Sequence, residues 1–324
     1  MFFKSPQRAA LISIISNLTL TTGKAGVAVI SGSTAILSEA LHSSLDLLAS
    51  LMAWLALKFS ASPPDREHPY GHGKFENLSG FLEGLLIFGV AAGIFYQAGH
   101  RLLHPVPVRF LTIAMGIMGL SAGLNLIIAT YLYKAARRFD SVALEADAAH
   151  LLTDVYTSVG VLIGLVGYYL SGHHLFDTIP ALLVGLVILY TAFKITWKSL
   201  AGLIDTRLPE IEEGEIRSLV QSFSPVLELT QLKSRKSGPT RHLDLNLLIC
   251  GRESLTKIHS LCDEIEDKIK ARFPRAEVQI HPEPCISGEN HCKSETCICP
   301  FRLDITYWTP NSSTPSPAQP DDDE

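Results

Sequence analysis

The segments SEALHSSLD, residues 38–46, and ADAAHLLTD, residues 146–154, each place a histidine and an aspartate four residues apart inside a long apolar stretch. Residues at positions i and i+4 lie on one face of a helix, so each segment presents an imidazole beside a carboxylate. Ionisable groups within apolar spans are costly and usually mark a pathway or a site. If the two faces meet, four side chains form a cage suited to a divalent transition metal. These ligands are His42, Asp46, His150 and Asp154.

Composition and clustering indicate a membrane protein. Only 18% of the 324 residues are charged, against roughly 25% in an average soluble domain, and nearly all long apolar runs precede residue 205. A bilayer core requires about 20 helical residues. Six segments reach that length: roughly 9–31, 35–60, 77–103, 108–134, 142–171 and 177–199. The first is interpreted as a membrane span and not as a cleavable signal peptide, because its apolar stretch is too long for one.

Basic residues in the loops predict the orientation of these spans. One side carries Lys4, Arg8, Arg66, Lys74, Lys134, Arg137, Arg138, Lys194 and Lys198, whereas the other carries only Arg101 and Arg109. The richer side is expected to be cytoplasmic, with both termini on it. The chain is therefore predicted to be a multi-pass protein of the cell (inner) membrane, in contact with lipid. No basic patch with interleaved aromatic residues is present in the sequence, so nucleic acid is not an expected partner.

From about residue 206 the long apolar runs give way to shorter amphipathic segments, which predict a small cytoplasmic α/β domain. Helices are expected over 210–223 and 254–273, and strands over 227–235, 240–250 and 276–281. This αββαβ order is enough for a small two-layer domain. The predicted boundaries are 1–206 for the six-helix transmembrane domain, 207–284 for the cytoplasmic domain, and 285–324 for a Cys-rich and then disordered acidic tail.

The ligand types of the cage fit Zn²⁺ best, because two imidazoles and two carboxylates suit tetrahedral coordination by borderline-soft donors. No cysteine precedes residue 250, and Mg²⁺ or Ca²⁺ would require more oxygens. Fe²⁺, Co²⁺, Ni²⁺, Cd²⁺ and Mn²⁺ stay open as alternatives. Metal binds deprotonated ligands, and imidazole has a reference pKa near 6.5, so protons compete with metal at neutral pH. His42 and His150 are therefore hypothesised to exchange protons for metal.

The two cage segments, together with DREHPYGHGK over residues 65–74, resemble the cation diffusion facilitator family from about residue 10 to residue 285. The resemblance implies a homodimeric, alternating-access transporter that moves metal out of the cytoplasm and is not an enzyme. It also implies that the αββαβ domain is of the ferredoxin-like or metallochaperone-like type. Some members carry aspartate where this chain has His42. The version with two histidines and two aspartates resembles the more zinc-selective type.

The resemblance implies roles for two further groups of residues. Asp65, His68 and His72 have a spacing that can gather three ligands locally, although a solvated polar loop would look the same. The resemblance implies a zinc site at these three residues. It also implies a charge interlock between Lys74 and Asp205 near the dimer interface, where the alternative is an ordinary juxtamembrane pair of little energetic value.

The cytoplasmic domain carries a weaker set of candidate ligands. His259, His281 and Glu283 match positions where relatives bind two zinc ions between protomers. Thr230 and Asn246 stand where further histidines are expected, which favours a reduced site. The alternative for His259 is a polar position on an amphipathic helix.

The tail holds a third group of candidates, which could bind Zn²⁺ or Cu⁺ or respond to redox state: Cys285, His291, Cys292, Cys297 and Cys299. Cys250 and Cys262 are interpreted as buried apolar residues instead. Within the spans, Asn17 is either a cavity residue or an interhelical hydrogen-bonding residue, and the second role is expected for Asn125. Three acidic residues near the cage could support it or carry protons: Glu39, Glu145 and Asp147.

The leading hypothesis is thus a secondary transporter that exports Zn²⁺ in exchange for protons. The first alternative is a membrane-bound metal sensor or storage protein, which would bind metal without moving it. The second is a membrane metalloenzyme. Catalytic zinc usually keeps an open coordination position, which a four-ligand cage does not leave, and the sequence has no H-E-x-x-H motif.

Overall fold

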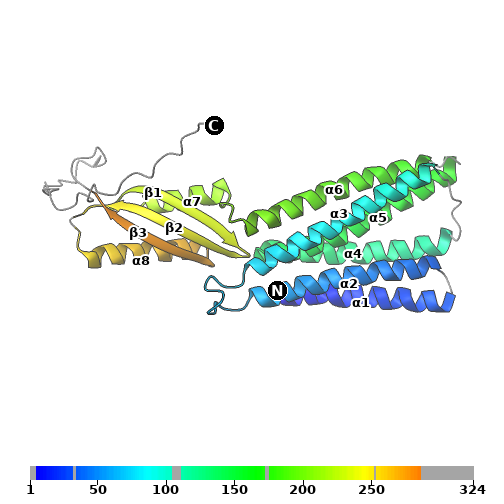
Figure 1. The fold of residues 1–324 in the computed structure, drawn as a ribbon, viewed down its shortest axis with the longest axis horizontal. Helices are drawn as coiled ribbons and strands as arrows, with labels where there is room; N and C mark the ends of the chain where they lie inside the picture. Colours follow the sequence, from blue (N-terminus) through cyan, green and yellow to red (C-terminus); the bar gives the residue numbers. More distant parts are fainter. Residues whose placement is uncertain (1–4, 32–33, 104–110, 172–174, 252, 286–324) are drawn as a thin grey trace, which may run out of the picture. The chain divides into compact units, whose positions relative to one another are not determined.

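The computed structural model describes residues 5–31, 34–103, 111–171, 175–251 and 253–285, and confirms six long helices followed by a small α/β unit (Figure 1). The long helices are α1 (Pro6–Ser31), α2 (Thr34–Ser60), α3 (Lys74–Leu103), α4 (Leu111–Phe139), α5 (Val142–Ser171) and α6 (Leu175–Leu203). Consecutive helices run in opposite directions, as the colours along the chain show (Figure 1). The end of the bundle where α1, α3 and α5 begin is called the proximal end, and the opposite end the distal end.

The surface of the bundle is apolar, as expected for helices that face lipid. Large side chains such as Ile15, Ile127 and Phe193 are 56%, 66% and 59% exposed, whereas many of the buried positions are alanines. Among the described residues, Lys74–His100 and Ile179–Leu203 are long and apolar enough to cross a membrane by length and composition.

Close helix packing places the two motif segments next to each other. α3 packs against α6, α4 against α5, and α1 against α2, while α2 also contacts α5. Small residues permit this approach: a Cβ atom at Gly84 of α3 would lie 2.2 Å from Thr196 Oγ1 of α6. The α2–α5 contact brings Asp46 close to His150 across a sequence separation of 104 residues.

Residues 234–242 belong to the same compact unit as the six helices. The Lys236 ammonium lies 2.5 Å from Asp140, and the Arg241 guanidinium lies 3.0 Å from it. Asp140 occupies the turn between α4 and α5 with a φ of 55°. The Gly238 N–H donates to Asn77 Oδ1 over 3.0 Å, with a φ of 56° that favours glycine. Two ion pairs and a hydrogen bond from the Gly238 backbone to the Asn77 side chain therefore hold this segment.

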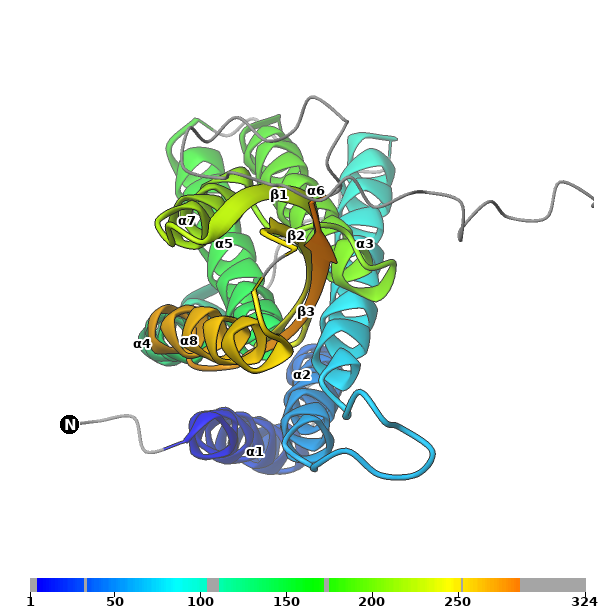
Figure 2. The same cartoon turned by 90° about the vertical axis from the view of Figure 1, so that its left-hand side faces the viewer.

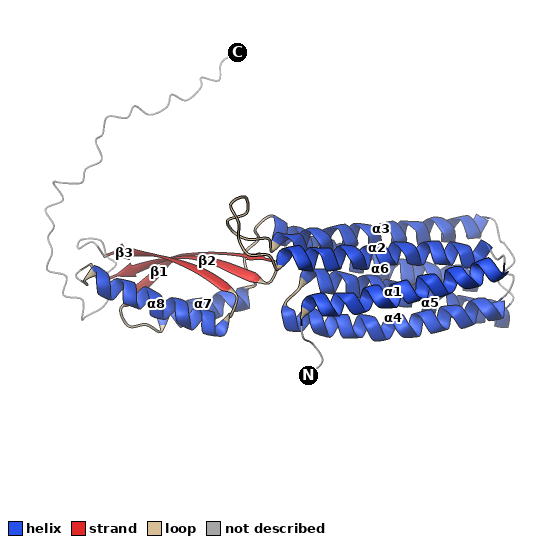
Figure 3. Cartoon of the chain, turned by 90° about the horizontal axis from the view of Figure 1, so that it is seen from below, coloured by secondary structure: helices blue, strands red, loops and turns tan. Residues whose placement is uncertain are grey.

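The second unit has the αββαβ order predicted from the sequence. Its elements are α7 (Glu210–Gln221), β1 (Val226–Ser237), β2 (Thr240–Ile249), α8 (Leu255–Arg272) and β3 (Ala276–Pro284), with the β1–β2 hairpin tip at residues 234–242 grouped with the helices instead. The strands are ordered β1-β2-β3, and both helices cover one face of the sheet (Figures 2 and 3). Alternate β2 residues Leu243, Leu245, Leu247 and Ile249 are buried, as are Ile216 and Val220 of α7 and Ile265 and Ile269 of α8. The period of two in β2 and the helical stripes therefore account for a two-layer core.

Candidate metal centre

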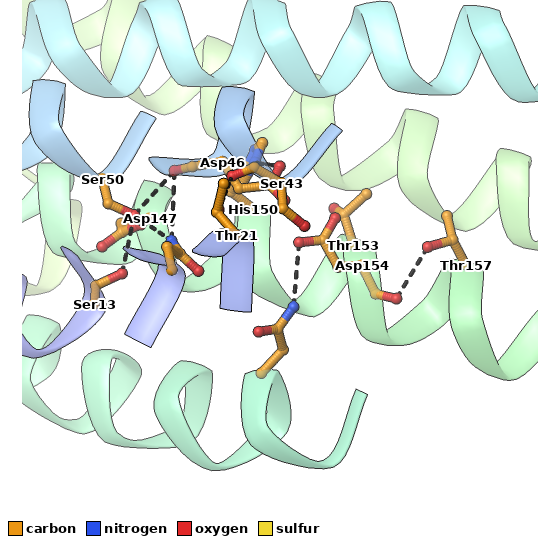
Figure 4. A network of polar contacts seen from close by, with 12 residues as sticks. Ser13, Thr21, Ser43, Asp46, Ser50, Asp147, His150, Thr153, Asp154 and Thr157 are labelled. Carbon is orange, nitrogen blue, oxygen red and sulfur yellow. Dashed lines mark hydrogen bonds and ion pairs between the residues drawn. The ribbon is translucent and has the colours of Figure 1, made fainter. Parts of the chain in front are cut away.

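Three of the four predicted cage residues meet inside the bundle. The ligand atoms of Asp46, His150 and Asp154 all lie within 4.8 Å of one another (Figure 4). His150 Nε2 is 3.2 Å from Asp46 Oδ1, and these two residues are only 4% and 6% exposed. The side chain of His42 lies outside the described part of the structure. Together with the partly buried Asp154, they provide two carboxylates and an imidazole, a donor set that suits a divalent cation.

Neighbouring polar residues position these ligands. The Asn125 amide on α4 donates to Asp154 Oδ2 over 3.3 Å, which confirms an interhelical hydrogen bond at Asn125. The Asn17 amide on α1 donates to Ser50 Oγ over 2.6 Å and, at 3.4 Å, to the carbonyl of Asp46. Both asparagines thus tie a flanking helix to a ligand residue, which is the usual way in which metal ligands are oriented.

A cavity of about 660 Å³ extends from the ligands toward the distal end of the bundle. Its walls include Asp46, His150 and Asp154, and then residues farther along α3 and α5 such as Gly93, Gln97 and Val161. The ligands therefore lie at the inner end of a cavity, as a site that exchanges ions requires.

The bundle is closed on the proximal side of the ligands. Ser50, Ala53 and Asp147 are each 0% exposed, and Leu57 and Leu144 are equally buried at 1% and 0%. Ser50 donates to Asp147 Oδ1 over 3.3 Å and lies 3.1 Å from Ser13 Oγ, so polar side chains from α1, α2 and α5 meet there (Figure 4). An ion in the centre thus has an open route on one side only.

Two ionisable residues near the metal ligands were not predicted from the sequence, because neither belongs to a paired motif. Lys24 of α1 lines the distal cavity, is 8% exposed, and donates to Ser43 Oγ over 2.7 Å. Glu83 of α3 is 0% exposed and accepts a hydrogen bond from Ser79 over 3.1 Å. A charge in the middle of an apolar span is a signal that could have found both, because such residues rarely occur by chance.

The loop between α2 and α3 gathers the second predicted ligand set. Asp65 Oδ1 lies 3.2 Å from His68 Nδ1, and Asp65 Oδ2 lies 3.3 Å from His72 Nε2. The backbone N–H of His68, which donates to Asp65 Oδ1 over 2.6 Å, is the main reason that the pKa of the Asp65 carboxyl lies below its usual value. Asp65 is therefore ionised at neutral pH, with two imidazoles beside it.

The predicted pair of Lys74 and Asp205 forms at the proximal end. Lys74 Nζ is 3.0 Å from Asp205 Oδ1 and also donates to the Leu203 carbonyl over 3.2 Å. Arg235 Nη1 lies 3.3 Å from the same carboxylate. Partial burial raises the pKa of Asp205, but the hydrogen bond and charge of Lys74 and the charge of Arg235 outweigh it, so the pKa is lowered.

The cytoplasmic-domain candidates do not form a metal-ligand cluster in the part of the chain that the structure describes, where only the two sets above gather three ligands. Glu283 accepts hydrogen bonds from Asn246 Nδ2 over 2.9 Å and from Thr230 Oγ1 over 3.3 Å. His259 pairs with Asp263 over 3.1 Å on α8, and His281 is exposed. Thr230 and Asn246 thus both donate hydrogen bonds to the Glu283 carboxylate.

Cys250 and Cys262 are only partly buried, whereas burial is expected for them from the sequence. Burial raises the pKa of the Cys262 thiol. Cys285 is described and has an intermediate exposure. The other tail candidates, His291, Cys292, Cys297 and Cys299, lie outside the described residues, as does the side chain of Glu39.

The chain combines a bundle of apolar helices, a cluster of imidazole and carboxylate ligands inside it, and a small αββαβ unit. This combination is typical of a membrane protein that binds metal cations. Residues 10–204 match the model of the cation efflux transmembrane domain, and residues 208–285 match that of the cation efflux protein cytoplasmic domain, a dimerisation domain. The chain belongs to the cation diffusion facilitator family. It is accordingly a multi-pass membrane protein of a family of metal cation transporters.

Two relatives that match most of the chain agree with this assignment. The uncharacterised transporter sll1263 of a Synechocystis species is 34% identical over 279 residues, which cover 85% of this chain and 89% of the relative. The cation-efflux pump FieF of Salmonella newport is 33% identical over 254 residues, covering 78% of this chain and 84% of FieF. One solved structure, titled as the zinc form of a putative zinc transporter CzrB, is 35% identical, with a match that covers 25% of this chain and 92% of the solved chain at a TM-score of 0.24.

Proposed function

We propose that this protein exports Zn²⁺ from the cytoplasm in exchange for protons, by alternating access. The observation that carries the proposal is the meeting of Asp46, His150 and Asp154 within 4.8 Å at the inner end of a cavity. The name of FieF, a cation-efflux pump, supports export as the direction. In the proposal, His42 is the fourth ligand.

The contact between His150 and Asp46 suggests how protons are coupled to metal. An imidazole nitrogen 3.2 Å from a carboxylate oxygen shares a proton with it. The same Nε2 can bind a cation only after that proton has left, because metal ligands must be deprotonated. Metal and proton therefore compete for the same atoms, and each can displace the other.

The shape of the cavity suggests which step the structure represents. With the termini in the cytoplasm, as the basic loops predict, the distal end faces outward. The ligands are reached from that end, whereas Ser50, Ala53 and Asp147 close the proximal side. This arrangement suits metal release and proton uptake. The cytoplasm-facing state requires the proximal side to open.

The donor set supports zinc as the cargo. One imidazole and two carboxylates, with His42 as a second imidazole, match the nitrogen and oxygen donors that Zn²⁺ takes in four-coordinate sites. Fe²⁺, Co²⁺, Ni²⁺, Cd²⁺ and Mn²⁺ are the competing cargoes in the test below.

We assign the remaining predicted sites supporting roles. Asp65, His68 and His72 would bind a zinc ion at the loop, and Lys74 with Asp205 would stabilise the homodimer. Because Glu283 is hydrogen-bonded by Thr230 and Asn246, metal at His259, His281 and Glu283 is proposed only as a reduced site. Cys285, His291, Cys292, Cys297 and Cys299 would bind metal near the entrance.

The test is metal uptake by sealed vesicles that contain the full-length protein, with a metal-sensing dye and a pH-sensing dye inside. The proposal expects Zn²⁺ uptake that is driven by an opposing proton gradient, with proton movement in the opposite direction. His150→Ala should abolish both signals. Binding of Zn²⁺ without uptake would instead support a sensor, and uptake indifferent to the pH gradient would refute antiport.

A further inference from the structure

A second cavity, of about 380 Å³, lies at the proximal end of the bundle, apart from the metal ligands. It is formed where the last turns of α4, the first residues of α5 and the last turns of α6 come together. Three of its lining residues are basic: Arg137, Lys194 and Lys198.

The basic charge of this cavity is only partly neutralised. Lys198 forms an ion pair with Glu145. The carboxylate of Asp140, which also lines the cavity, already contacts two other cations, Lys236 and Arg241. Within the described ranges, Arg137 and Lys194 have no carboxylate partner. The cavity therefore holds two cations that lack a counter-charge.

Two other features favour an anion at this position. Ser141 and Val142 line the cavity, so the N-terminal end of the 30-residue helix α5 points its positive dipole there. The Arg137 guanidinium lies over the Tyr133 ring, 4.9 Å from its centroid, which fixes the plane of its donors. A planar, oriented guanidinium is well suited to bind two oxygens of a phosphate.

The surroundings identify the source of that phosphate as lipid. Tyr190, Phe193 and Trp197 of α6 are 69%, 59% and 60% exposed and flank Lys194 and Lys198, and the rings of Phe193 and Trp197 stack at 6.3 Å. Exposed aromatic residues next to basic residues mark the headgroup level of a membrane. Basic pockets between transmembrane helices on the Lys/Arg-rich side are a known type of lipid headgroup site.

We propose that this cavity binds the phosphate-bearing headgroup of an anionic phospholipid, through Arg137 and Lys194, in the leaflet around the proximal end. The headgroup ties α4 to α6 across the start of α5, the helix that carries His150 and Asp154. It thereby stabilises the closed proximal side seen in the structure. The site shares no residue with the metal centre, so the proposal does not depend on which ion is transported.

The test is native mass spectrometry of the full-length protein, titrated separately with phosphatidylglycerol and phosphatidylcholine. Wild type should retain phosphatidylglycerol preferentially. The double variant Arg137→Gln/Lys194→Gln should bind it about 25-fold more weakly, because each basic residue near a membrane surface contributes about fivefold. The variant Arg137→Lys/Lys194→Arg, which keeps both charges, should retain most of the binding.

The matched control is Lys58→Gln/Lys134→Gln, which removes the same charge at the same end from two exposed residues outside the cavity. Equal weakening in both double variants would overturn the proposal, because it would mean a general surface attraction. Displacement of the lipid by an equal concentration of inorganic phosphate would overturn it as well, by showing a site for free phosphate. If the double variant does not fold, the single variants apply, each with an expected loss of about fivefold.

Discussion

Asn125 offers the most exacting test of the site geometry, because it contacts a ligand without being one. Asn125→Ala removes the amide that donates to Asp154 Oδ2 over 3.3 Å. Hydrogen bonds to charged groups contribute about 1.5–3 kcal/mol, and this distance is slightly longer than usual, so the lower end, ~1.5 kcal/mol, applies. That energy corresponds to about tenfold weaker zinc binding. The loss lies within the range typical of residues that orient metal ligands.

The assay is a zinc titration of the full-length protein against a chelating dye, in a His68→Ala/His72→Ala background that removes the loop site. Ser121→Ala is the matched control, since Ser121 lines the same cavity and is 7% exposed. It should bind zinc as the background does. The reasoning is refuted if Asn125→Ala stays within about twofold of the background, or if Ser121→Ala weakens binding equally.

Two other predictions concern packing and pH. Gly84→Ala should lower the melting temperature, by a destabilisation of ~1–3 kcal/mol, because its Cβ would lie 2.2 Å from Thr196 Oγ1 and 3.0 Å from Thr196 N. In Gly99→Ala the added Cβ meets no atom within 4 Å, so this variant should melt at the wild-type temperature. Equal melting temperatures for wild type, Gly84→Ala and Gly99→Ala would contradict the close packing of α3 on α6. The pKa of Asp205 is lowered from its ordinary value of 3.8. The stabilisation from its ion pair with Lys74 is therefore fully present above pH 3.8, and it is lost only as the pH falls through the lowered pKa. The difference in the free energy of unfolding between wild type and Asp205→Asn should therefore stay constant from about pH 8 to about pH 5. A difference that vanishes at about pH 5 would contradict the lowered pKa of Asp205.

Periodicity and length were sufficient to predict the fold. The apolar runs predicted all six long helices, and α8 and β2 were predicted to within one residue at each end. These elements are well defined in the sequence because each buries one face or faces lipid along its whole length. The hairpin tip at 234–242 was not predicted to group with the helices, because its ion pairs with Asp140 join residues about a hundred positions apart.

The candidate site was predictable where ligands recur at helical spacing. The four-residue interval placed His150 and Asp154 on one face, and the duplicated pattern pointed to Asp46 as their neighbour. Spacing along one helix does not show which residues of other helices reach the ligands. The contacts of Asn125 with Asp154 and of Asn17 with the Asp46 carbonyl therefore required the structure.

The central claim is that these side chains share one metal ion, and X-ray absorption spectroscopy of bound zinc tests it most directly. The full-length His68→Ala/His72→Ala variant, with Cys285, Cys292, Cys297 and Cys299 also replaced by serine to remove the proposed tail site, would be loaded with one equivalent of Zn²⁺. The predicted spectrum has only nitrogen and oxygen neighbours at about 2.0–2.2 Å, with an imidazole contribution that decreases in His150→Ala. Sulfur neighbours at about 2.3 Å, or a spectrum that His150→Ala leaves unchanged, would contradict the claim.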